Sequence, residues 1–325
     1  MLPSKSTSFL SSLREFKRIY IVGHMRPDAD CITSQLGIKH LCLFLGLEAY
    51  CWNEGPFNRK ESSPYKDSFL SLSALPRDTE NSALCLVDCS TLPRAGKIPL
   101  WLAQLPLFVV DHHQSEDIAD DDPHIICDPD SPAAVALVFE LLQAAQCPID
   151  TDLAQLLFLG IASDTYFFRY VEPHQYNIFA ITARLLQSGA SPRKGADELE
   201  ITSSYEAMRL IGALIERMRP IENTPFVYTY MTLEEKQKAG PIESSLLYEA
   251  MLRTEPHKAL LFAWEESSSI IVGNLRAKAP LSILDIATRF GGGGHAQAAG
   301  FRQKNTSLHT VLKQTKEHIQ KVFVK

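Results

Sequence analysis

Short apolar runs alternate with helix-like stretches along the first half of the chain. The runs at Arg18–Val22, Ala83–Val87 and Leu107–Val110 are each followed directly by a glycine or an aspartate, which is typical of buried strands. The stretch Cys31–Leu47 has the character of a helix. Strands alternating with helices indicate an α/β fold with a mainly parallel sheet flanked by helices. In such sheets ligands bind beyond the carboxyl ends of the strands.

The pattern continues with helices and then changes character. Further helices are expected at Ser131–Gln146, Asp152–Asp164, Gln175–Gln187 and Ser204–Met218. Between them, the segment from Ala190 to Glu200 interrupts the periodicity with proline, glycine and charged residues. We therefore predict a first domain at residues 1–190, a linker and connecting helix at 191–218, and a second domain at 219–325.

The second domain has its own alternation of elements. Strand-like runs occur at Phe226–Met231, Leu260–Trp264 and Ile270–Leu275, and helices are expected near Ser282–Phe290 and Ser307–Val322. This is a smaller α/β unit. No internal repeat or low-complexity segment is visible in the sequence.

Composition supports two globular domains and excludes several other classes. With 325 residues, of which 45% are apolar and 22% charged, the chain has material for two cores and is neither disordered nor a coiled coil. The formal net charge of -6 argues against a protein that coats long duplex nucleic acid by bulk charge. Short anionic ligands remain compatible with it.

The cysteines and the apolar segments bear on location. The 7 cysteines form no C-x-x-C pair, so neither a disulfide framework nor a zinc cage is expected, and a reducing cytoplasm fits best. Charged residues between Arg14 and Arg18 interrupt the segment where a secretion signal would be apolar. The longest apolar runs are shorter than the roughly 18 residues that a membrane span needs.

Candidate chemistry begins directly after the first strand. His24, Asp28 and Asp30 lie within Gly23–Asp30, at the start of the expected helix. Aspartates at a helix start are most often caps, and on its own this cluster favours capping over metal binding. An imidazole beside two carboxylates is nevertheless a potential ligand set.

Similar groups follow the other strands. Asp88 follows the second run, and Asp111, His112 and His113 follow the third, while Asp164 ends an apolar helix. Each could be a turn or surface residue when taken alone. Two adjacent histidines at one strand end could divide their roles, one binding metal and the other facing substrate.

Together these residues form a candidate binuclear metal site. Imidazole and carboxylate ligands without thiolate suit Mn²⁺ and leave other divalent ions open. Two such ions, about 3.5–4 Å apart, are the usual device for in-line attack on phosphorus. The candidate ligands are His24, Asp28, Asp30, Asp88, His112 and Asp164.

A glycine run lies in the second domain. Gly291, Gly292, Gly293 and Gly294 precede His295, and free amides near a helix start could cradle a phosphate. A flexible loop is the alternative. Arg276 could grip a phosphate or stack on a base, or it could be a surface arginine that closes a strand.

The ordered motifs GHMRPDAD, VDCS, VDHHQS, GIASDT and GGGGHAQAAGF resemble those of the DHH/DHHA1 family of phosphoesterases. The resemblance covers nearly the whole chain. It is strongest to the stand-alone oligoribonuclease and pAp-phosphatase type, whose relatives include cyclic-dinucleotide phosphodiesterases. It implies an N-terminal DHH domain, a smaller C-terminal DHHA1 domain and an active site in the cleft between them.

The resemblance also implies roles for the candidate residues. One metal would be held by His24, Asp28 and Asp88, and the other by Asp30, Asp88, His112 and Asp164, so that Asp88 bridges the pair. His113 would contact the scissile phosphate, and Asp111 would orient an imidazole. The phosphate and nucleotide of the substrate would be held by Arg276, Gly291–Gly294 and His295.

Two positions depart from the family pattern. Tyr166 stands where glycine is common, and Asn274 stands where serine often precedes the arginine. Neither is a proposed ligand, so they affect the shape of the pocket and substrate preference.

Several functions follow as hypotheses. The leading one is a Mn²⁺-dependent phosphodiesterase that converts short oligonucleotides or linear dinucleotides to mononucleotides, and pAp to AMP. Hydrolysis of cyclic di-AMP, a pyrophosphatase or polyphosphatase activity, and a non-catalytic nucleotide- or RNA-binding module are the alternatives. A homodimer is expected by analogy only.

Overall fold

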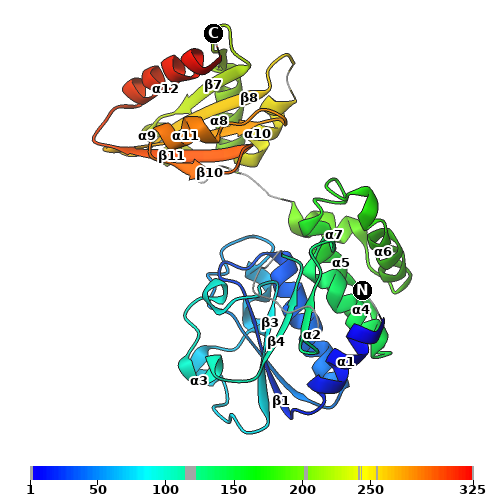
Figure 1. Ribbon diagram of the computed structural model, residues 1–325. Helices are drawn as coiled ribbons and strands as arrows, with labels where there is room; N and C mark the ends of the chain where they lie inside the picture. Colours follow the sequence, from blue (N-terminus) through cyan, green and yellow to red (C-terminus); the bar gives the residue numbers. More distant parts are fainter. Residues whose placement is uncertain are drawn as a thin grey trace. The chain divides into compact units, whose positions relative to one another are not determined.

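The apolar runs of the first half of the chain form a five-stranded parallel sheet in the computed structural model (Figure 1). The strand order is β2-β1-β3-β4-β5. Every residue of β1 and β3 is buried, as expected for a parallel sheet covered on both faces. The strands are β1 (Arg18–Gly23), β2 (Glu48–Trp52), β3 (Ser82–Val87), β4 (Leu107–Asp111) and β5 (Ile125–Cys127).

Alternate residues of β1 supply two different cores. Ile19 and Ile21 belong to a large apolar cluster that includes α1, α2, α4 and α5, whereas Tyr20 and Val22 belong to a smaller cluster on the opposite face with α3. The α-helices of this unit are α1 (Pro3–Leu13), α2 (Ala29–Phe44), α3 (Leu100–Ala103), α4 (Ala134–Ala144), α5 (Thr151–Asp164), α6 (Asn177–Gln187) and α7 (Pro192–Leu199). Short 3₁₀ turns lie at Ser63–Ser68, Leu72–Ala74, Leu92–Ala95 and Pro173–Gln175.

Gly23 allows the end of β1 to approach α2 closely. A Cβ at this position would lie 2.3 Å from Cys31 Sγ and 2.6 Å from Gln35 Oε1. The Gln35 amide nitrogen donates to the carbonyl oxygens of Ile21 and Trp52. The start of α2 is thereby fixed against the carboxyl ends of two strands, where the candidate ligands begin.

The second half of the chain forms a six-stranded mixed sheet in the order β10-β11-β9-β8-β7-β6. Within this second sheet, as far as its residues are described, only the β7–β8 pair is parallel. The strands are β6 (Arg219–Pro220), β7 (Phe226–Met231), β8 (Ala259–Ser267), β9 (Ile270–Ala277), β10 (Gly293–Gly294) and β11 (Ala298–Lys304). The helices are α8 (Tyr205–Glu216), α9 (Leu233–Ala239), α10 (Ser244–Leu252), α11 (Leu284–Arg289) and α12 (Leu308–Phe323).

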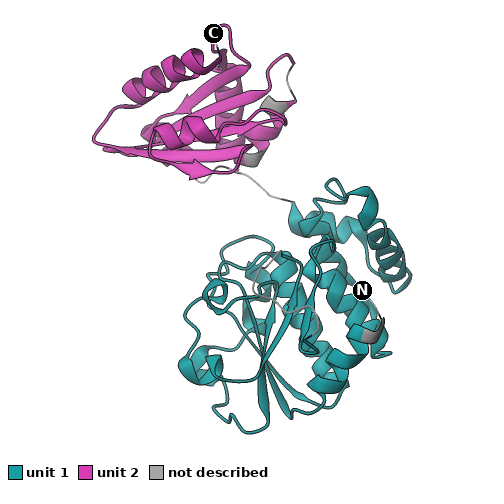
Figure 2. Cartoon of the chain, viewed as in Figure 1, with its two compact units in different colours: residues 1–200 teal, residues 201–325 magenta. Residues whose placement is uncertain are grey.

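The chain divides into two compact units, residues 1–200 and 201–325 (Figure 2). The structure describes residues 3–113, 122–200, 204–240, 242, 244–253 and 255–323. The two-domain α/β architecture expected from the sequence is confirmed. The segment assigned to a linker, 191–218, is divided, with α7 in the first unit and α8 in the second.

One segment read as irregular in the sequence is helical. The stretch Ala190–Glu200 contains α7 because Ser191 caps it, accepting a hydrogen bond from the Lys194 amide, and Pro192 occupies the first turn, where proline is tolerated. Gly195 lies against Phe158, and a Cβ there would be 2.7 Å from the ring. The proline and glycine that suggested a break therefore serve the start and the packing of a helix.

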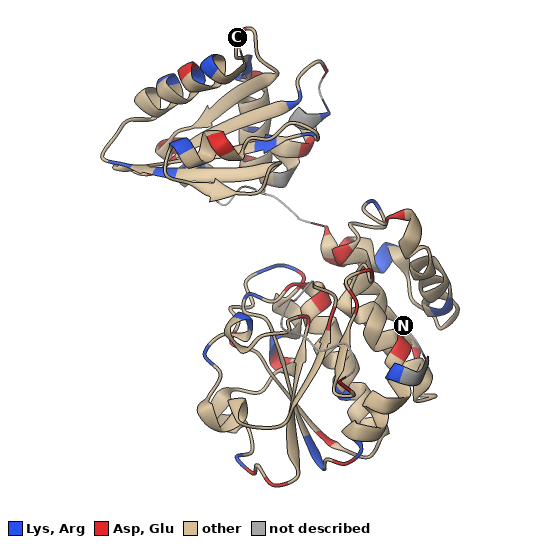
Figure 3. Ribbon diagram, viewed as in Figure 1, with Lys and Arg blue, Asp and Glu red and all other residues tan. Residues whose placement is uncertain are grey.

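Lys, Arg, Asp and Glu are interspersed over both units (Figure 3). Within the described residues, no helix combines the length and the apolar character that crossing a bilayer requires.

Candidate metal and phosphoester site

The candidate ligands of the first unit come from the carboxyl ends of adjacent strands. His24 follows β1, Asp88 follows β3, and His112 follows β4, and these three strands are neighbours in the sheet. Asp28 caps the N-terminus of α2, with Asp30 in its first turn, and Asp164 is the last residue of α5. The parallel sheet thus brings together residues that are up to 140 positions apart in the chain.

Asp88 lies at the centre of this group. Its Oδ2 is 3.2 Å from His24 Nε2, and its Oδ1 is 3.4 Å from His112 Nε2. The carboxylate is 3% exposed, and its Oδ1 has no hydrogen-bond donor among the described residues. Its backbone has φ 57°, a left-handed conformation that few non-glycine residues adopt. Each oxygen of Asp88 therefore faces a different histidine.

Asp30 is wholly buried and belongs both to the site and to the core. Its Oδ2 accepts a hydrogen bond from the Ala134 amide at 2.7 Å, and its Oδ1 accepts one from the Val135 amide at 2.9 Å. These amides open α4, whose N-terminal dipole favours a negative charge. Asp30 Oδ2 also lies 3.9 Å from His112 Nε2.

The imidazoles of the candidate ligands His24 and His112 are oriented by backbone carbonyl groups. His112 Nδ1 is 3.2 Å from the Ser131 carbonyl oxygen, and His24 Nδ1 is 2.8 Å from that of Met25. Each histidine therefore donates from Nδ1 and presents Nε2 to the carboxylates. His112 Nε2 is 3.4 Å from Asp164 Oδ2, and His24 Nε2 is 3.7 Å from Asp28 Oδ1.

The crowding of acids and imidazoles shifts their pKa values. Burial and then the charges of Asp164 and Asp88 raise the pKa of Asp30 well above its ordinary range. Burial, together with Asp88, raises the pKa of Asp164 to about 7. Burial alone would also raise the pKa of Asp88, but its contacts with His112 and His24 lower it to about 2.

The pKa values of the two histidines are raised, although burial by itself would lower them. Burial would lower the pKa of His112, but Asp88 and the other carboxylates raise it to about 10. The pKa of His24 is likewise raised, by Asp28 and Asp88, against the effect of burial. Without a cation, the site thus keeps protons to balance its carboxylates, and a divalent cation could take their place.

The donor set fits divalent metal ions. Among the described residues, three groups have ligand atoms within 4.8 Å of one another: His24–Cys31–Asp88, Asp88–His112–His113 and Asp30–His112–Asp164. Burial raises the pKa of the Cys31 thiol to about 12, so without a bound cation this thiol is protonated near neutral pH. The remaining donors are imidazole nitrogens and carboxylate oxygens, which suit Mn²⁺ and similar ions.

His113 lies beside the ligands and has its own partners. Its Nδ1 is 2.8 Å from Asp111 Oδ1, and its Nε2 is 3.3 Å from Arg94 Nη2. Asp111 is wholly buried. Because arginine can only donate, Nε2 of His113 accepts and Nδ1–H donates to Asp111. Asp111 therefore fixes the orientation of the His113 ring.

Two arginines near the site were not predicted from the sequence. Arg94 contacts His113, and Arg59 Nη1 is 3.5 Å from Asp28 Oδ2. Both lie in connecting segments where the sequence pattern gives no sign of proximity to the strand ends. A pocket of about 610 Å³ is lined by His24, Met25, Arg26, Pro93 and Arg94. Cationic side chains therefore border the ligand group on the side of this pocket.

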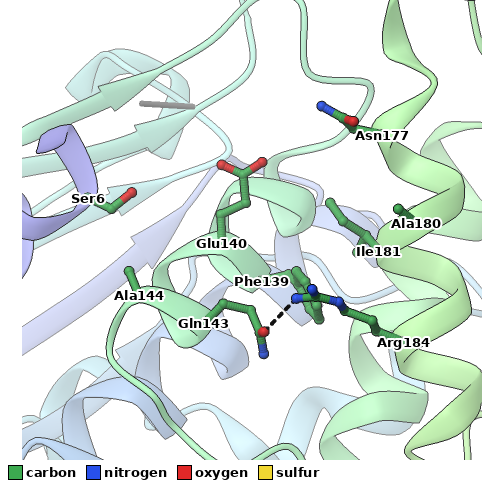
Figure 4. A pocket seen from close by; sticks show the side chains of 9 residues that line it. All are labelled: Ser6, Phe139, Glu140, Gln143, Ala144, Asn177, Ala180, Ile181 and Arg184. Atoms are coloured by element: carbon green, nitrogen blue, oxygen red, sulfur yellow. Dashed lines mark hydrogen bonds between the residues drawn. The ribbon is translucent and has the colours of Figure 1, made fainter. Parts of the chain in front are cut away.

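A second pocket of the same unit is lined by different residues from the first. It has a volume of about 440 Å³ and lies between α4 and α6 (Figure 4), where Arg184 Nη1 donates to Gln143 Oε1 at 2.8 Å. Its lining contains none of the candidate metal ligands. The chemistry expected from the sequence is therefore not located there.

The candidate substrate-binding residues of the second unit lie on β9, in and directly before β10, and in the turn between β10 and β11. Arg276 on β9 pairs with Ala298 on β11, and the Ala298 carbonyl accepts a hydrogen bond from the His295 amide at 2.8 Å. The structure therefore brings Arg276 and His295 close together. The Arg276 guanidinium is 4.7 Å from the centre of the Tyr248 ring, so this tyrosine occupies one face of it.

The sequence suggested that the amides of the glycine run could lie near a helix start. In the structure the run lies after the end of a helix instead. It follows the end of α11 and enters β10, where Gly293 and Gly294 pair with β11. A Cβ at Gly292 would lie 2.0 Å from the Gly300 carbonyl oxygen, and one at Gly294 would lie 2.4 Å from that of Ala298. These two glycines are needed for close strand packing, and a helix dipole does not contribute at this loop.

Two known protein-domain families match this chain, one in each unit. Residues 18–161 match the DHH family, N-terminal domain, and residues 223–323 match the DHHA1 domain. The chain belongs to the DHH/DHHA1 family of phosphoesterases, as its ordered motifs indicated.

Individual relatives span nearly the whole chain at low identity. The bifunctional oligoribonuclease and PAP phosphatase NrnA of Mycoplasma pneumoniae is 24% identical over 302 residues, 90% of this chain and 89% of that protein. The protein of the same name from Thermus thermophilus is 25% identical over 305 residues, 93% of this chain and 89% of that one. An exopolyphosphatase-related protein from Bacteroides fragilis has a similar fold, with a TM-score of 0.79, 22% identity, and coverage of 100% of this chain and 98% of the other.

Proposed function

We propose that this protein is a Mn²⁺-dependent phosphodiesterase that hydrolyses short oligoribonucleotides or linear dinucleotides such as pApA to mononucleotides, and converts pAp to AMP. The observation that carries the proposal is the buried carboxylate of Asp88, whose two oxygens face His24 at 3.2 Å and His112 at 3.4 Å. A carboxylate in this position can bridge two cations.

Two cations are proposed, each with its own ligands. His24, Asp28 and Asp88 would hold one, and Asp30, Asp88, His112 and Asp164 would hold the other. When bound, such ions lower the pKa of a water molecule and polarise a phosphoryl oxygen. The protein positions their ligands in advance, because carbonyl groups orient the two imidazoles and α4 fixes Asp30.

The neighbouring residues provide for the phosphate. His113 is held by Asp111, and its Nε2 lies beside the Arg94 guanidinium. A phosphate oxygen at this point could receive hydrogen bonds from Arg94 and contact the His113 ring, which would stabilise charge that develops in the transition state. Arg276, Gly291–Gly294 and His295 are proposed to hold the nucleotide and its phosphate.

Short substrates are favoured by charge and by the relatives. A net charge of -6 opposes extended polyanions, and local arginines suffice for a few phosphates. The names of the two NrnA relatives assign them oligoribonuclease and PAP phosphatase activities. We extend these activities to this chain, and the cytoplasmic location and the homodimer remain predictions.

Hydrolysis of cyclic di-AMP is the second candidate. It uses the same attack on phosphorus, and the arrangement of ligands in the first unit serves either substrate. The choice between them is therefore a question of relative rates.

The proposal is tested by a product-resolved assay of the purified chain with Mn²⁺. pApA, cyclic di-AMP, pAp and pyrophosphate are offered in parallel, with a chelator control. Rapid, chelator-sensitive conversion of pApA to AMP, with slow loss of the cyclic form, is the expected result. Equal rates on cyclic di-AMP would favour the second candidate, and hydrolysis of pyrophosphate alone would exclude both.

A variant pair links any activity to the proposed site. Asp88→Ala should abolish turnover, whereas Asp152→Ala, at an exposed position in the first turn of α5, should leave it unchanged. Near wild-type hydrolysis by Asp88→Ala at saturating metal would contradict the bridging role. Inactivity of the wild type on all four substrates would instead favour a binding module.

A further inference from the structure

The segment after α5 has an unusual backbone. Tyr166, Phe167 and Phe168 have φ values of 48°, 53° and 66°, so three consecutive bulky residues are in the left-handed region. Such residues rarely adopt this conformation, because it brings the Cβ against the backbone. Strain of this kind persists where surrounding contacts enforce it, and it concentrates at functional sites. The segment begins immediately after Asp164 and Thr165.

Hydrogen bonds and two of the rings hold this segment in place. The Phe167 amide donates to the Ala162 carbonyl oxygen at 2.8 Å, and the Phe168 amide donates to Thr165 Oγ1 at 3.0 Å. The rings of Phe167 and Phe168 each lie 6.5 Å from that of Phe158, which is 1% exposed. Packing against the core accounts for Phe168, whereas Phe167 contacts the core only at its edge and is 39% exposed.

Tyr166 has a different environment. Its side chain is 65% exposed, and its ring centre is 5.1 Å from that of Tyr170, which is 59% exposed. The Tyr170 amide donates to the Thr165 carbonyl oxygen at 3.2 Å, so the second tyrosine is tied to the same turn. At φ 48°, glycine would satisfy the backbone without strain. Core packing therefore does not explain a tyrosine at this position.

We propose that Tyr166 and Tyr170 form a stacking surface for a nucleobase of the substrate, in which one ring offers its face and the other, inclined at 71°, supports it edge-on. This inference rests on the proposed function and names residues that select the substrate of the same site. A single residue, Thr165, separates Tyr166 from the ligand candidate Asp164, which limits the distance between their Cα atoms to about 7 Å. A base on this surface therefore belongs to a nucleotide at or next to the reacting phosphate.

The chemistry of the pair suits a base of any identity. Every nucleobase has a π face, and stacking on tyrosine depends little on hydrogen-bonding pattern. The Arg169 guanidinium lies 5.6 Å from the centre of the Tyr170 ring, which adds positive charge beside an anionic ligand. The surface thus favours nucleotides over phosphoesters without an aromatic group, such as pyrophosphate.

The test compares substrates with and without the base. Tyr166→Gly, Tyr166→Phe and the wild type are assayed on pApA and on an analogue that lacks one adenine, with Tyr176→Ala, at a 68% exposed tyrosine outside this turn, as the control. Tyr166→Gly should raise KM for pApA about tenfold and leave kcat and the abasic substrate nearly unchanged. Tyr166→Phe and Tyr176→Ala should behave as the wild type.

Two results would overturn the inference. One is an equal KM for pApA in Tyr166→Gly and the wild type, and the other is an equal rise on both substrates. A change of sedimentation in Tyr166→Gly without a change in KM would assign the surface to a second copy of the chain and would also refute it.

A binding measurement separates this inference from the proposed function. A dinucleotide containing 2-aminopurine should lose fluorescence on binding the wild type and Tyr166→Phe, and lose less with Tyr166→Gly. Quenching by a wild type that does not hydrolyse pApA would refute the proposed function and retain the stacking surface. Turnover of pApA with identical quenching by all three proteins would retain the proposed function and refute the stacking surface.

Discussion

Metal binding should stabilise the first unit, and Asp88→Ala should remove most of this effect. The ligand atoms of Asp30, His112 and Asp164 lie within 4.8 Å of one another. Two ionised carboxylates at that separation would repel by about 3 kcal/mol at an effective dielectric constant of about 20, which is why the metal-free site retains protons. A divalent cation removes this repulsion in the folded state, and the unfolded chain has no such cluster for it to bind.

The size of the effect follows from linkage. A ligand at a hundred times its dissociation constant stabilises the folded state by about 2.7 kcal/mol. For a unit of this size, each kcal/mol shifts the Tm by about 2–4 °C. Saturating Mn²⁺ should therefore raise the Tm of the wild-type unit by about 5–10 °C.

The assay is thermal unfolding of the full chain with Mn²⁺ or with a chelator, followed by near-UV circular dichroism. Each variant serves as its own reference, so any loss of intrinsic stability in Asp88→Ala cancels. Asp152→Ala should keep the full shift. The reasoning is refuted if the Mn²⁺-induced shift of Asp88→Ala equals that of the wild type, because both cations are then bound without the central carboxylate.

Three further predictions address packing, pH and substrate binding. Gly160→Ala should destabilise the fold by about 1–3 kcal/mol, because its Cβ would lie 2.2 Å from Thr33 Oγ1, whereas Gly212→Ala, with open space at its Cβ, should not; urea denaturation measures both, and equal stabilities would contradict the packing argument. The raised pKa of Asp164, about 7, means that its contribution to metal-free stability is complete below its ordinary value of 3.8 and lost as pH rises through about 7. In chelator, the Tm of the wild type should therefore fall more steeply between about pH 4 and pH 7 than that of Asp164→Asn, and parallel curves would rule this out. His295→Ala should raise KM with little change in kcat, and steady-state kinetics showing a loss in kcat alone would place His295 in the chemistry instead.

The ligand cluster was predictable because it depends on topology. Polar residues that follow adjacent parallel strands must meet at one edge of the sheet, so the proximity of His24, Asp88 and His112 follows from recognising three strands. The particular hydrogen bonds between these side chains and the rest of the unit could not be predicted in this way. That Asp30 would be bonded to the first amides of α4 depends on how two helices pack, which no local pattern encodes.

Three features of the structure differ from the sequence-based expectations or were absent from them, and each has a local cause. The helix α7 was read as a break because proline and glycine are usually signs of one, whereas here Pro192 begins the helix and Gly195 makes room for Phe158. The glycine run was linked to a helix start, but it lies in a hairpin whose strands approach too closely for a Cβ. Arg94 was missed because a single arginine in a connecting segment carries no periodic signal.

The bonds from Asp30 to the amides of Ala134 and Val135 restrict how this site can evolve. A substitution that exchanges this ligand for an imidazole or a thiol would leave two buried amides without an acceptor, and each costs about 1–3 kcal/mol. A substitution of Asp30 that altered metal preference would therefore also destabilise the N-terminus of α4. The side chain of Tyr166 is exposed, so under the proposed stacking role a substitution there would change substrate preference without breaking a buried hydrogen bond.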